Sequence, residues 1–279
     1  MAGSLTQEQI DQYHEQGFVI VSDILSPDEI QMYKERARAI ALGDHPEEAK
    51  SRIMKDVRIV KGLLPEPEDP EKGLWKLMNP DRFDETFAQY METPKLLDAL
   101  ESLIGEDIVA FLLMLIYKPP HIEAIHPYHQ DGFYFPFGPH DDIVATWVPL
   151  DDADGDNGTL RVIPGSHKKG IIEHKMPETL TNAFSFEAAG YDDDPTEIVC
   201  EVKAGDAVLF HSRLLHKTGG NSTDRHRRVL TIHGCSSKCK WTGDSSIPEY
   251  GMRLVRGQNY EGCIEAPEKL SLQFGKATK

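Results

Sequence analysis

Six short apolar runs in the second half of the chain limit its fold more than any other feature of the sequence. Pro, Gly and Asp separate these runs, which cover residues 108–117, 143–150, 159–163, 197–202, 207–210 and 229–233. Short apolar segments with turn residues between them are typical of an all-β barrel or sandwich. The run at 108–117 has about half the length that a membrane-spanning helix needs, so it is expected to be a core segment. The second half is therefore predicted to be a β core without a membrane span.

The first third of the chain carries helix signals instead. Thr6 with Gln9, and Ser26 with Glu29, have the pattern of a capping box, in which side chains bond the free N–H groups of the first helical turn. Helices are expected between Thr6 and Gly17, from Ser26 to about Leu42 and over residues 94–104, with a buried strand at 18–21. Residues 44–73 are rich in Pro, Glu and Asp, so they are predicted to form an exposed loop. A lid is one function considered for this loop.

One domain is expected for residues 1–279, because the helices of the first half have too few apolar residues to form a second hydrophobic core. Residues 1–107 are predicted to form a helical buttress with the variable loop. Residues 108–235 are predicted to form the β core, and residues 236–279 a C-terminal extension. The fold class is mainly β with flanking helices.

Charge and cysteine content exclude several classes of protein. The 46 Asp and Glu residues against 30 Lys and Arg give a formal net charge of −16, which repels nucleic acid and anionic lipid surfaces. Four cysteines are too few for a disulfide framework and fit a reducing compartment. Cys235 and Cys239 are expected to be packed thiols, with half of a zinc site as the alternative. Neither end matches a secretory signal or a peroxisomal address, so a cytoplasmic location is expected.

The segment from His126 to Asp131 carries the strongest chemical signal. In an extended strand His129 and Asp131 project from one face while Gln130 points away. One imidazole and one carboxylate are two of the three ligands of a facial triad for Fe(II), and the third must be a histidine from a later strand. His216 is the candidate. A loop hydrogen bond between His129 and Asp131 is the alternative.

Arg227, eleven residues beyond His216, suits a clamp for a carboxylate, because guanidinium presents paired donors in one plane. It could hold the far end of a dicarboxylate whose near end chelates the metal ion. The alternative is that the charged residues at 224–228 are solvated turn residues.

These residues belong to a longer series of motifs in a specific order. The motifs cover residues 5–9, 17–20, 54–57, 115–120, 129–137, 157–160, 163–168, 205–206, 216 and 221–222. With them, nearly the whole chain resembles the iron- and 2-oxoglutarate-dependent phytanoyl-CoA dioxygenase family. The resemblance implies a double-stranded β-helix, a jelly roll of the cupin type, as the core.

The resemblance also implies which residues form the site. The Fe(II) ligands of the family correspond to His129, Asp131 and His216. The residues that correspond to those binding the distal carboxylate of 2-oxoglutarate are Arg227 and Thr218. Four further positions are expected near 2-oxoglutarate, and they are Lys76, Met114, Gln130 and Trp147. An exposed surface position is the alternative for Lys76.

The implied reaction consumes 2-oxoglutarate and O2, releases succinate and CO2, and is supported by ascorbate in vitro. Because halogenating relatives lack the carboxylate ligand, Asp131 favours hydroxylation of an aliphatic C–H bond, such as one next to a carboxyl or an acyl-CoA thioester. The expected partner is a small molecule, which could be a lipid, an acyl-CoA or a natural product. Lys168, Lys169, Arg225 and Arg228 are candidates for binding the phosphates of a coenzyme A thioester.

Aromatic residues beside the iron motif are candidates for contacts with the substrate. Phe133, Tyr134, Phe135 and His126 are assigned to the substrate pocket, with hydrophobic core as an equal alternative for the aromatic cluster that also includes Phe137. The remaining histidines nearby, His167, His211 and His233, are expected to be structural.

Two other classes of function remain open at this point. One is a catalytically silent cupin-like module that binds metal or 2-oxoglutarate as a sensor or scaffold, and the other is an acidic interaction protein. The complete His, Asp, His and Arg set argues against both, and the sequence carries no signal for an oligomeric state.

Overall fold

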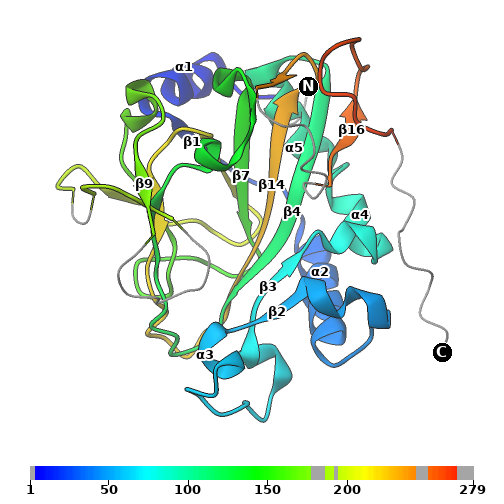
Figure 1. Ribbon diagram of the computed structural model, residues 1–279, viewed down its shortest axis with the longest axis vertical. Coiled ribbons are helices and arrows are strands. Elements are labelled where there is room, and N and C mark those ends of the chain that lie inside the picture. The colour runs from blue at the N-terminus through cyan, green and yellow to red at the C-terminus, as the bar shows by residue number, and fades with distance from the viewer. Residues whose placement is uncertain (1–3, 177–185, 192–193, 243–250, 269–279) are drawn as a thin grey trace.

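The structure is a computed structural model, and it describes residues 4–176, 186–191, 194–242 and 251–268. Two antiparallel sheets face each other as the layers of a double-stranded β-helix, with helices on the outer face of the larger sheet (Figure 1). The mainly β fold with flanking helices is confirmed. No helix in the described part of the chain has the length and apolar character that crossing a bilayer requires.

The larger sheet has eight strands in the order β1-β12-β7-β14-β4-β3-β2, with β16 also paired to β4. Its strands are β1 (Phe18–Val21), β2 (Ile53–Lys55), β3 (Leu74–Met78), β4 (Ile108–Lys118), β7 (Ile143–Pro149), β12 (Ala207–His211), β14 (Arg227–Ser236) and β16 (Arg253–Arg256). The central strands β7 and β12 are buried along their whole length, which explains why they read as continuous apolar runs in the sequence.

The smaller sheet has the order β11-β8-β13-β5. Its strands are β5 (His126–His129), β8 (Leu160–Val162), β11 (Ile198–Val199) and β13 (His216–Thr218). Two further pairs join β6 (Phe137–Gly138) to β15 (Lys240–Trp241) and β9 (His174–Lys175) to β10 (Glu187–Ala188). All six apolar runs that the sequence singled out lie on strands of the two main sheets.

The described helices lie mainly in the first 107 residues. They are α1 (Gln7–Gln16), α2 (Pro27–Ala41), α3 (Val57–Val60), α4 (Glu85–Tyr90) and α5 (Pro94–Ile104), and the 3-10 turns are η1 (Glu47–Arg52), η2 (Pro70–Gly73), η3 (Pro80–Arg82), η4 (Asp131–Tyr134), η5 (His140–Asp142) and η6 (Ser166–Lys169). Both predicted capping boxes form, at Thr6 with Gln9 and at Ser26 with Glu29. The three predicted helices are therefore confirmed.

Helix α5 shows how a helix covers the larger sheet. Leu96, Leu97, Leu100 and Ile104 recur at helical spacing and are buried. A side chain at Gly234 of β14 would lie 3.0 Å from Leu100 Cδ1, so glycine there lets the helix approach the sheet closely.

The prediction of a loop at residues 44–73 is wrong in part. This segment contains η1, β2, α3 and η2, and β2 pairs with β3, which the sequence analysis did not predict. The first 107 residues thus supply β1, β2 and β3 to the larger sheet in addition to the helices. The reason is long-range pairing: a strand of three residues has no periodicity of its own, and its partner at 74–78 lies beyond the proline-rich stretch.

The four cysteines are free thiols. Cys235 and Cys239 are fully buried in an apolar cluster with Phe111, Phe137 and Ile143. Packed thiols are therefore the correct reading of this pair. The same cluster takes in Leu254, Ile264 and Ala266, so the C-terminal extension packs against the β core.

Candidate active site

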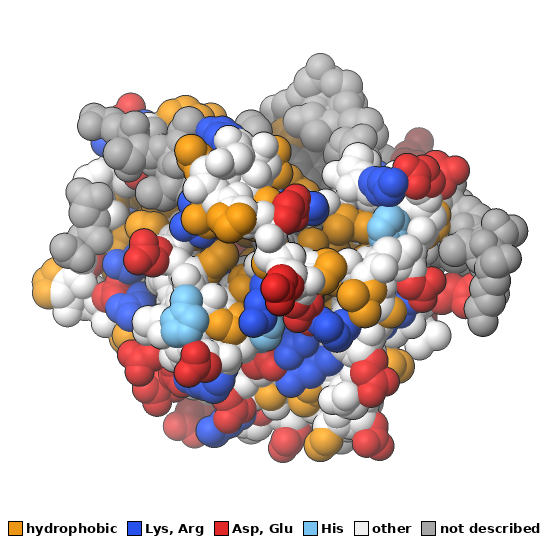
Figure 2. Space-filling model, turned by 90° about the horizontal axis from the view of Figure 1, so that it is seen from below, with side chains coloured by type: hydrophobic (Ala, Val, Ile, Leu, Met, Phe, Trp, Pro, Cys, Tyr) orange, Lys and Arg blue, Asp and Glu red, His pale blue; other side chains and the backbone are white. Residues whose placement is uncertain are grey.

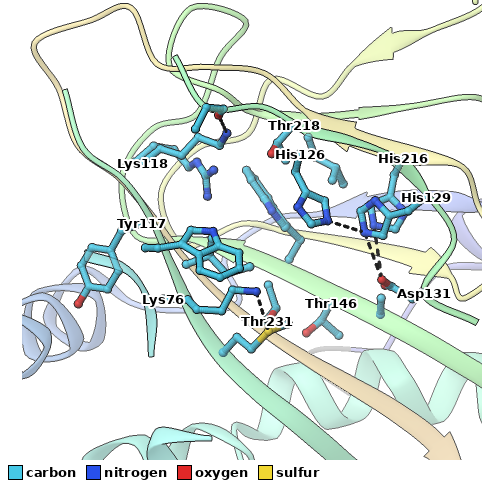
Figure 3. A pocket seen from close by; sticks show the side chains of 18 of the residues that line it. Lys76, Tyr117, Lys118, His126, His129, Asp131, Thr146, His216, Thr218 and Thr231 are labelled. Carbon is cyan, nitrogen blue, oxygen red and sulfur yellow. Dashed lines mark hydrogen bonds and ion pairs between the residues drawn. The ribbon is translucent and has the colours of Figure 1, made fainter. Parts of the chain in front are cut away.

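Two histidines face each other across neighbouring strands of the smaller sheet. His129 at the end of β5 is the register partner of His216 at the start of β13. Asp131 follows in η4, and its Oδ1 atom lies 3.6 Å from His129 Nε2 and 3.7 Å from His216 Nε2. Figure 3 shows the three side chains converging at one end of a cavity. The structure thus brings together the three residues that the sequence assigned to a metal ion.

The hydrogen bonds of the two imidazoles fix which nitrogen faces the metal position. His129 Nδ1 lies 2.9 Å from Pro127 O, and His216 Nδ1 lies 2.9 Å from Leu214 O. A carbonyl oxygen only accepts, so each Nδ1 carries the proton and donates it. Each Nε2 therefore presents a lone pair toward the carboxylate of Asp131. Lone pairs and a negative charge in one place repel unless a cation lies between them, so this donor set fits a divalent metal ion.

His129 and Asp131 already have the charges that metal binding requires. Burial, and then the neighbouring His216, lower the pKa of His129 to about 3. Burial alone would raise the pKa of Asp131, but His216 and His233 outweigh it, and the pKa is lowered. At neutral pH the His129 imidazole is neutral and the carboxylate is ionised, so no proton has to leave these groups before a metal ion binds.

Acidification is expected to destabilise the ligand-free protein between pH 6.5 and about 4. Burial lowers the pKa of His129 to about 3 and that of His211 to about 4, whereas the unfolded chain takes up these protons near pH 6.5. The unfolded state then binds more protons than the folded state, so each histidine removes up to about 1.4 kcal/mol of stability per pH unit. Urea unfolding at pH 7 and pH 5.5 measures the loss. The variant His211→Asn should show a smaller loss, and equal unfolding free energies at the two pH values would contradict this prediction.

A fourth residue, which the sequence analysis assigned to the core, holds the carboxylate in place. His233 of β14 donates from Nε2 to Asp131 Oδ2 at 2.9 Å. Its ring stacks on Phe111 at 5.4 Å and meets Phe135 edge-on at 5.0 Å, so the imidazole is itself held by packing. With Oδ2 engaged, Oδ1 is the oxygen left to face the two histidines. Residues 227, 229, 231 and 233 alternate along one strand, and this spacing from Arg227 is a signal in the sequence from which the place of His233 in the cavity could have been predicted.

Replacing His233 by Phe is expected to weaken binding of Mn(II) to the ligand-free protein about 10- to 100-fold, the usual effect of losing an outer hydrogen-bond partner of a metal ligand. The phenyl ring fits among Phe111 and Phe135, so the fold should persist. Calorimetric titration with Mn(II) measures the change. His211→Phe is the matched control, because His211 bonds Asp141 at 3.1 Å outside the cavity. Equal Mn(II) affinities of the His233 variant and the unchanged protein would show that Asp131 needs no such support.

Arg227 lies at the other end of the same cavity. Its side chain is 1% exposed, and none of its three guanidinium nitrogens has a hydrogen-bond partner among the described residues. Burial lowers its pKa to about 9. Its Cζ atom lies 5.7 Å from the centre of the Trp147 ring, which also lines the cavity. A buried cation with all donors free is unstable on its own, so the arrangement fits an anionic ligand such as a carboxylate.

The cavity between the triad and Arg227 has a volume of about 120 Å³. Lys76, Met114, Trp147 and Thr218 all line it. Lys76 Nζ lies 4.0 Å from Met114 Sδ, and burial lowers its pKa to about 8, so the alternative of an exposed surface lysine is wrong. Five residues besides Arg227 were assigned to the 2-oxoglutarate site, and four of them therefore line the same cavity as Arg227.

Gln130 is the exception. Its side chain donates to Gly170 O and Arg213 O and accepts from the backbone N–H of Ile172. The residue is fully buried but does not line the cavity. The strand alternation of residues 129–131 predicts this orientation. The structure therefore places Gln130 behind the triad, where it ties the loops at 170–172 and 213 to β5.

Lys118, to which the sequence analysis gave no role, also lines the cavity. Its Nζ donates to Ala124 O at 2.6 Å and to Gly219 O at 2.5 Å. A side chain at Gly158 would lie 2.7 Å from Lys118 Cδ, so glycine makes room for the buried lysine. Burial, and then Arg227, lower the pKa of Lys118. Lys118 thereby joins the turns that precede β5 and follow β13.

Of the four residues assigned to the substrate pocket, His126 alone lines the cavity. Phe133 is 37% exposed and stacks on His174 at 4.2 Å, and Phe135 is buried in the apolar cluster of Phe111. Tyr134 bonds the backbone of Phe186. The prediction for these three aromatics assumed an extended strand. Residues 131–134 form a 3-10 turn instead, which rotates the side chains out of alternation.

The candidates for binding coenzyme A phosphates are already engaged. Lys168 pairs with Glu15 at 2.7 Å, Arg225 with Asp154 at 2.7 Å, and Arg228 with Asp151 at 2.9 Å. Lys169 lies 3.3 Å from the hydroxyl of Tyr191. Figure 2 shows basic side chains interspersed with acidic ones on the end of the molecule that it presents. Three of these four cations are thus neutralised by carboxylates, as the acidic composition would lead one to expect.

The remaining histidines have structural contacts. His167 Nε2 lies 3.2 Å from His14 O, and His211 Nε2 lies 3.1 Å from Asp141 Oδ1. The structural role predicted for these two residues is confirmed.

Comparison with known proteins adds independent findings. The sequence profile described as phytanoyl-CoA dioxygenase matches residues 13–229. A peroxisomal phytanoyl-CoA dioxygenase of Rattus norvegicus is 33% identical over 243 residues, which are 85% of this chain and 70% of the relative. The apo structure of the non-heme monooxygenase ThoJ is 21% identical with a TM-score of 0.68, covering 94% of this chain and 89% of that one. The epimerase SnoN, solved with Fe3+, alpha ketoglutarate and nogalamycin RO, is 19% identical with a TM-score of 0.65, covering 96% of each chain.

Proposed function

The chain belongs to the phytanoyl-CoA dioxygenase family of iron- and 2-oxoglutarate-dependent oxygenases, and from this premise we propose that it hydroxylates an aliphatic C–H bond of a small molecule. His129, Asp131 and His216 would hold Fe(II). Arg227 and Thr218 would hold the distal carboxylate of 2-oxoglutarate. Lys76, Met114 and Trp147 would line the cosubstrate's place in the cavity.

The observation that carries this proposal is the complementarity of the two ends of one cavity. At one end, the Nε2 atoms of His129 and His216 lie 3.6 and 3.7 Å from Oδ1 of Asp131, while the Nδ1 atoms of both imidazoles donate to backbone carbonyls. At the other end, the buried guanidinium of Arg227 lacks any partner among the described residues. The first end suits a cation, and the second suits a carboxylate. A metal ion chelated by a keto dicarboxylic acid supplies both.

Iron with 2-oxoglutarate supplies, when bound, the oxidative decarboxylation to succinate and CO2 that is coupled to oxidation of a C–H bond by O2. The protein's own residues orient and protect these groups. Hydrogen bonds fix the imidazoles of His129 and His216 and the ionised carboxylate of Asp131 before any ligand enters. Trp147, Ile116 and Leu160 line the cavity with apolar surface and limit the entry of water. Asp131 fills the ligand position that a halide would need, which favours hydroxylation over halogenation.

The substrate is proposed to be a small organic molecule that carries an aliphatic carbon next to a carboxyl or thioester carbonyl. A coenzyme A thioester is the less favoured form, because Lys168, Arg225 and Arg228 already pair with carboxylates. Free acids are therefore the first compounds to test, and matched thioesters the second.

The test is formation of succinate from 2-oxoglutarate by protein supplied with Fe(II), ascorbate and O2. We expect succinate to form faster when a substrate is present, and a product whose mass has increased by one oxygen atom taken from ¹⁸O2. Tight 2-oxoglutarate binding without succinate formation across the panel of acids and thioesters would favour the sensor or scaffold. Absence of metal-dependent 2-oxoglutarate binding would overturn the proposal.

A further inference from the structure

His126 occupies a position that neither the metal triad nor the carboxylate clamp explains. It begins β5, opposite Thr218 of β13, and its ring lines the cavity. In Figure 3 the imidazole lies between Thr218 at the clamp end and the pair of His129 and Asp131 at the metal end. A ligand that reaches from the metal position to Arg227 therefore passes the ring of His126.

The hydrogen bond of His126 in the metal-free protein is one that a metal ion must break. His126 Nε2 lies 3.2 Å from His129 Nε2. Because His129 Nδ1 donates to Pro127 O, its Nε2 is the acceptor of this bond, and His126 Nε2 carries the proton. The same lone pair of His129 is the one directed at the metal position. A metal ion and the N–H group of His126 therefore compete for it.

When a metal ion takes that lone pair, the N–H group of His126 loses its acceptor. No second protein acceptor for this group is present in the described parts of the chain, and the half-buried ring lies edge-on against His129 with a centroid distance of 4.2 Å. An N–H group that lines a cavity and has lost its acceptor favours an oxygen brought within hydrogen-bond reach.

From this geometry we propose that His126 is a catalytic residue that donates its Nε2 hydrogen bond to a carboxylate oxygen of the bound keto acid. Metal binding transfers this donor from His129 to the ligand. The inference rests on the proposed function, because it requires an oxygen ligand that spans the cavity. It assigns His126 to the cosubstrate rather than to the substrate contact expected from the sequence.

Two variants separate this role from the other roles that a histidine in the cavity wall can have. His126→Leu removes the donor and keeps an apolar side chain, while His126→Gln keeps an N–H donor of similar reach. The metal affinity of the ligand-free variants is measured with Mn(II), and 2-oxoglutarate affinity is then measured on the Mn(II)-loaded proteins. Under anaerobic conditions with Fe(II), the visible metal-to-ligand charge-transfer band of bound 2-oxoglutarate gives a second readout that does not depend on turnover.

In His126→Leu we expect Mn(II) affinity to be unchanged or higher, because the competing hydrogen bond to His129 is gone. The affinity of the loaded protein for 2-oxoglutarate should fall about tenfold or more, as expected for a hydrogen bond to a charged group. The charge-transfer band should shift, and His126→Gln should recover part of the affinity.

Other results overturn the inference in distinguishable ways. A tenfold loss of Mn(II) affinity in His126→Leu would make His126 a fourth metal ligand. Unchanged 2-oxoglutarate affinity and an unshifted band, in a variant that melts like the unchanged protein, would leave His126 no part in ligand binding. If His126→Leu does not fold, His126→Gln takes its place in the experiment. A tenfold loss of Mn(II) affinity in His126→Gln also counts against the inference. If the unchanged protein binds no 2-oxoglutarate with Mn(II), the proposed function itself fails.

Discussion

Asp131→Ala is expected to reduce succinate formation to background and to abolish the stabilisation that Mn(II) gives the protein. Asp131 supplies the only negative charge among the three metal-facing side chains, and its Oδ1 atom lies 3.6 and 3.7 Å from the two imidazole nitrogens. Mn(II) affinity should fall by more than about 100-fold, which is the upper end of the loss expected when an outer hydrogen-bond partner of a metal ligand is removed. The measurements are succinate release and the melting temperature with and without Mn(II).

The matched control for this variant is Asp141→Asn. Asp141 also bonds a histidine, His211, but it lies outside the cavity. The Asp141→Asn variant should keep both turnover and the Mn(II)-dependent rise in melting temperature. Turnover in Asp131→Ala equal to that of the unchanged protein would mean that the carboxylate is no part of the metal site.

Arg227→Met is expected to weaken 2-oxoglutarate binding by about 100-fold or more while Mn(II) affinity stays the same. The buried guanidinium of Arg227 has paired donors that suit a carboxylate, and hydrogen bonds between ionised groups are the strong ones. The ligand-free variant should also melt at a higher temperature than the unchanged protein, because methionine removes a buried cation whose nitrogens have no partner among the described residues. Quenching of tryptophan fluorescence and calorimetry measure the two affinities.

Arg225→Met is the control, since Arg225 lies two residues away, is half exposed and pairs with Asp154. It should change neither affinity. Arg227→Lys should recover only part of the binding, because an ammonium group cannot present two donors in one plane. A destabilised Arg227→Met protein with normal 2-oxoglutarate affinity would assign the guanidinium a structural role.

The pairing of His129 with Asp131 was predictable from a local signal, whereas His216 and Arg227 were assigned from their setting on later strands and from the order of the family's motifs. His129 and Asp131 are two residues apart, and the turn that follows His216 leads to Arg227 on the next strand. Capping boxes at Thr6 and Ser26 placed two helix starts for the same reason: the residues that make the contact are three positions apart.

The parts that the sequence did not reveal depend on contacts between distant segments. His233 lies among apolar neighbours on β14, so its burial was expected, but its bond to Asp131 joins residues 102 positions apart. The pairing of β2 with β3 spans the proline-rich stretch in the same way. Phe133 and Tyr134 do not line the cavity of the triad and Arg227 for a local reason, because a 3-10 turn and a strand are hard to tell apart over four residues.

The hydrogen bond from His233 to Asp131 runs from the larger sheet to the segment that leaves the smaller one. His129 and His216 both belong to the smaller sheet, whereas the group that aims the third ligand belongs to the other layer. Phe111 and Phe135 pack against the ring of His233, so they help to set where the carboxylate of Asp131 lies relative to the two imidazoles. A change of core volume at these two phenylalanines would therefore be expected to alter the affinity for a metal ion, although the three ligands themselves are unchanged.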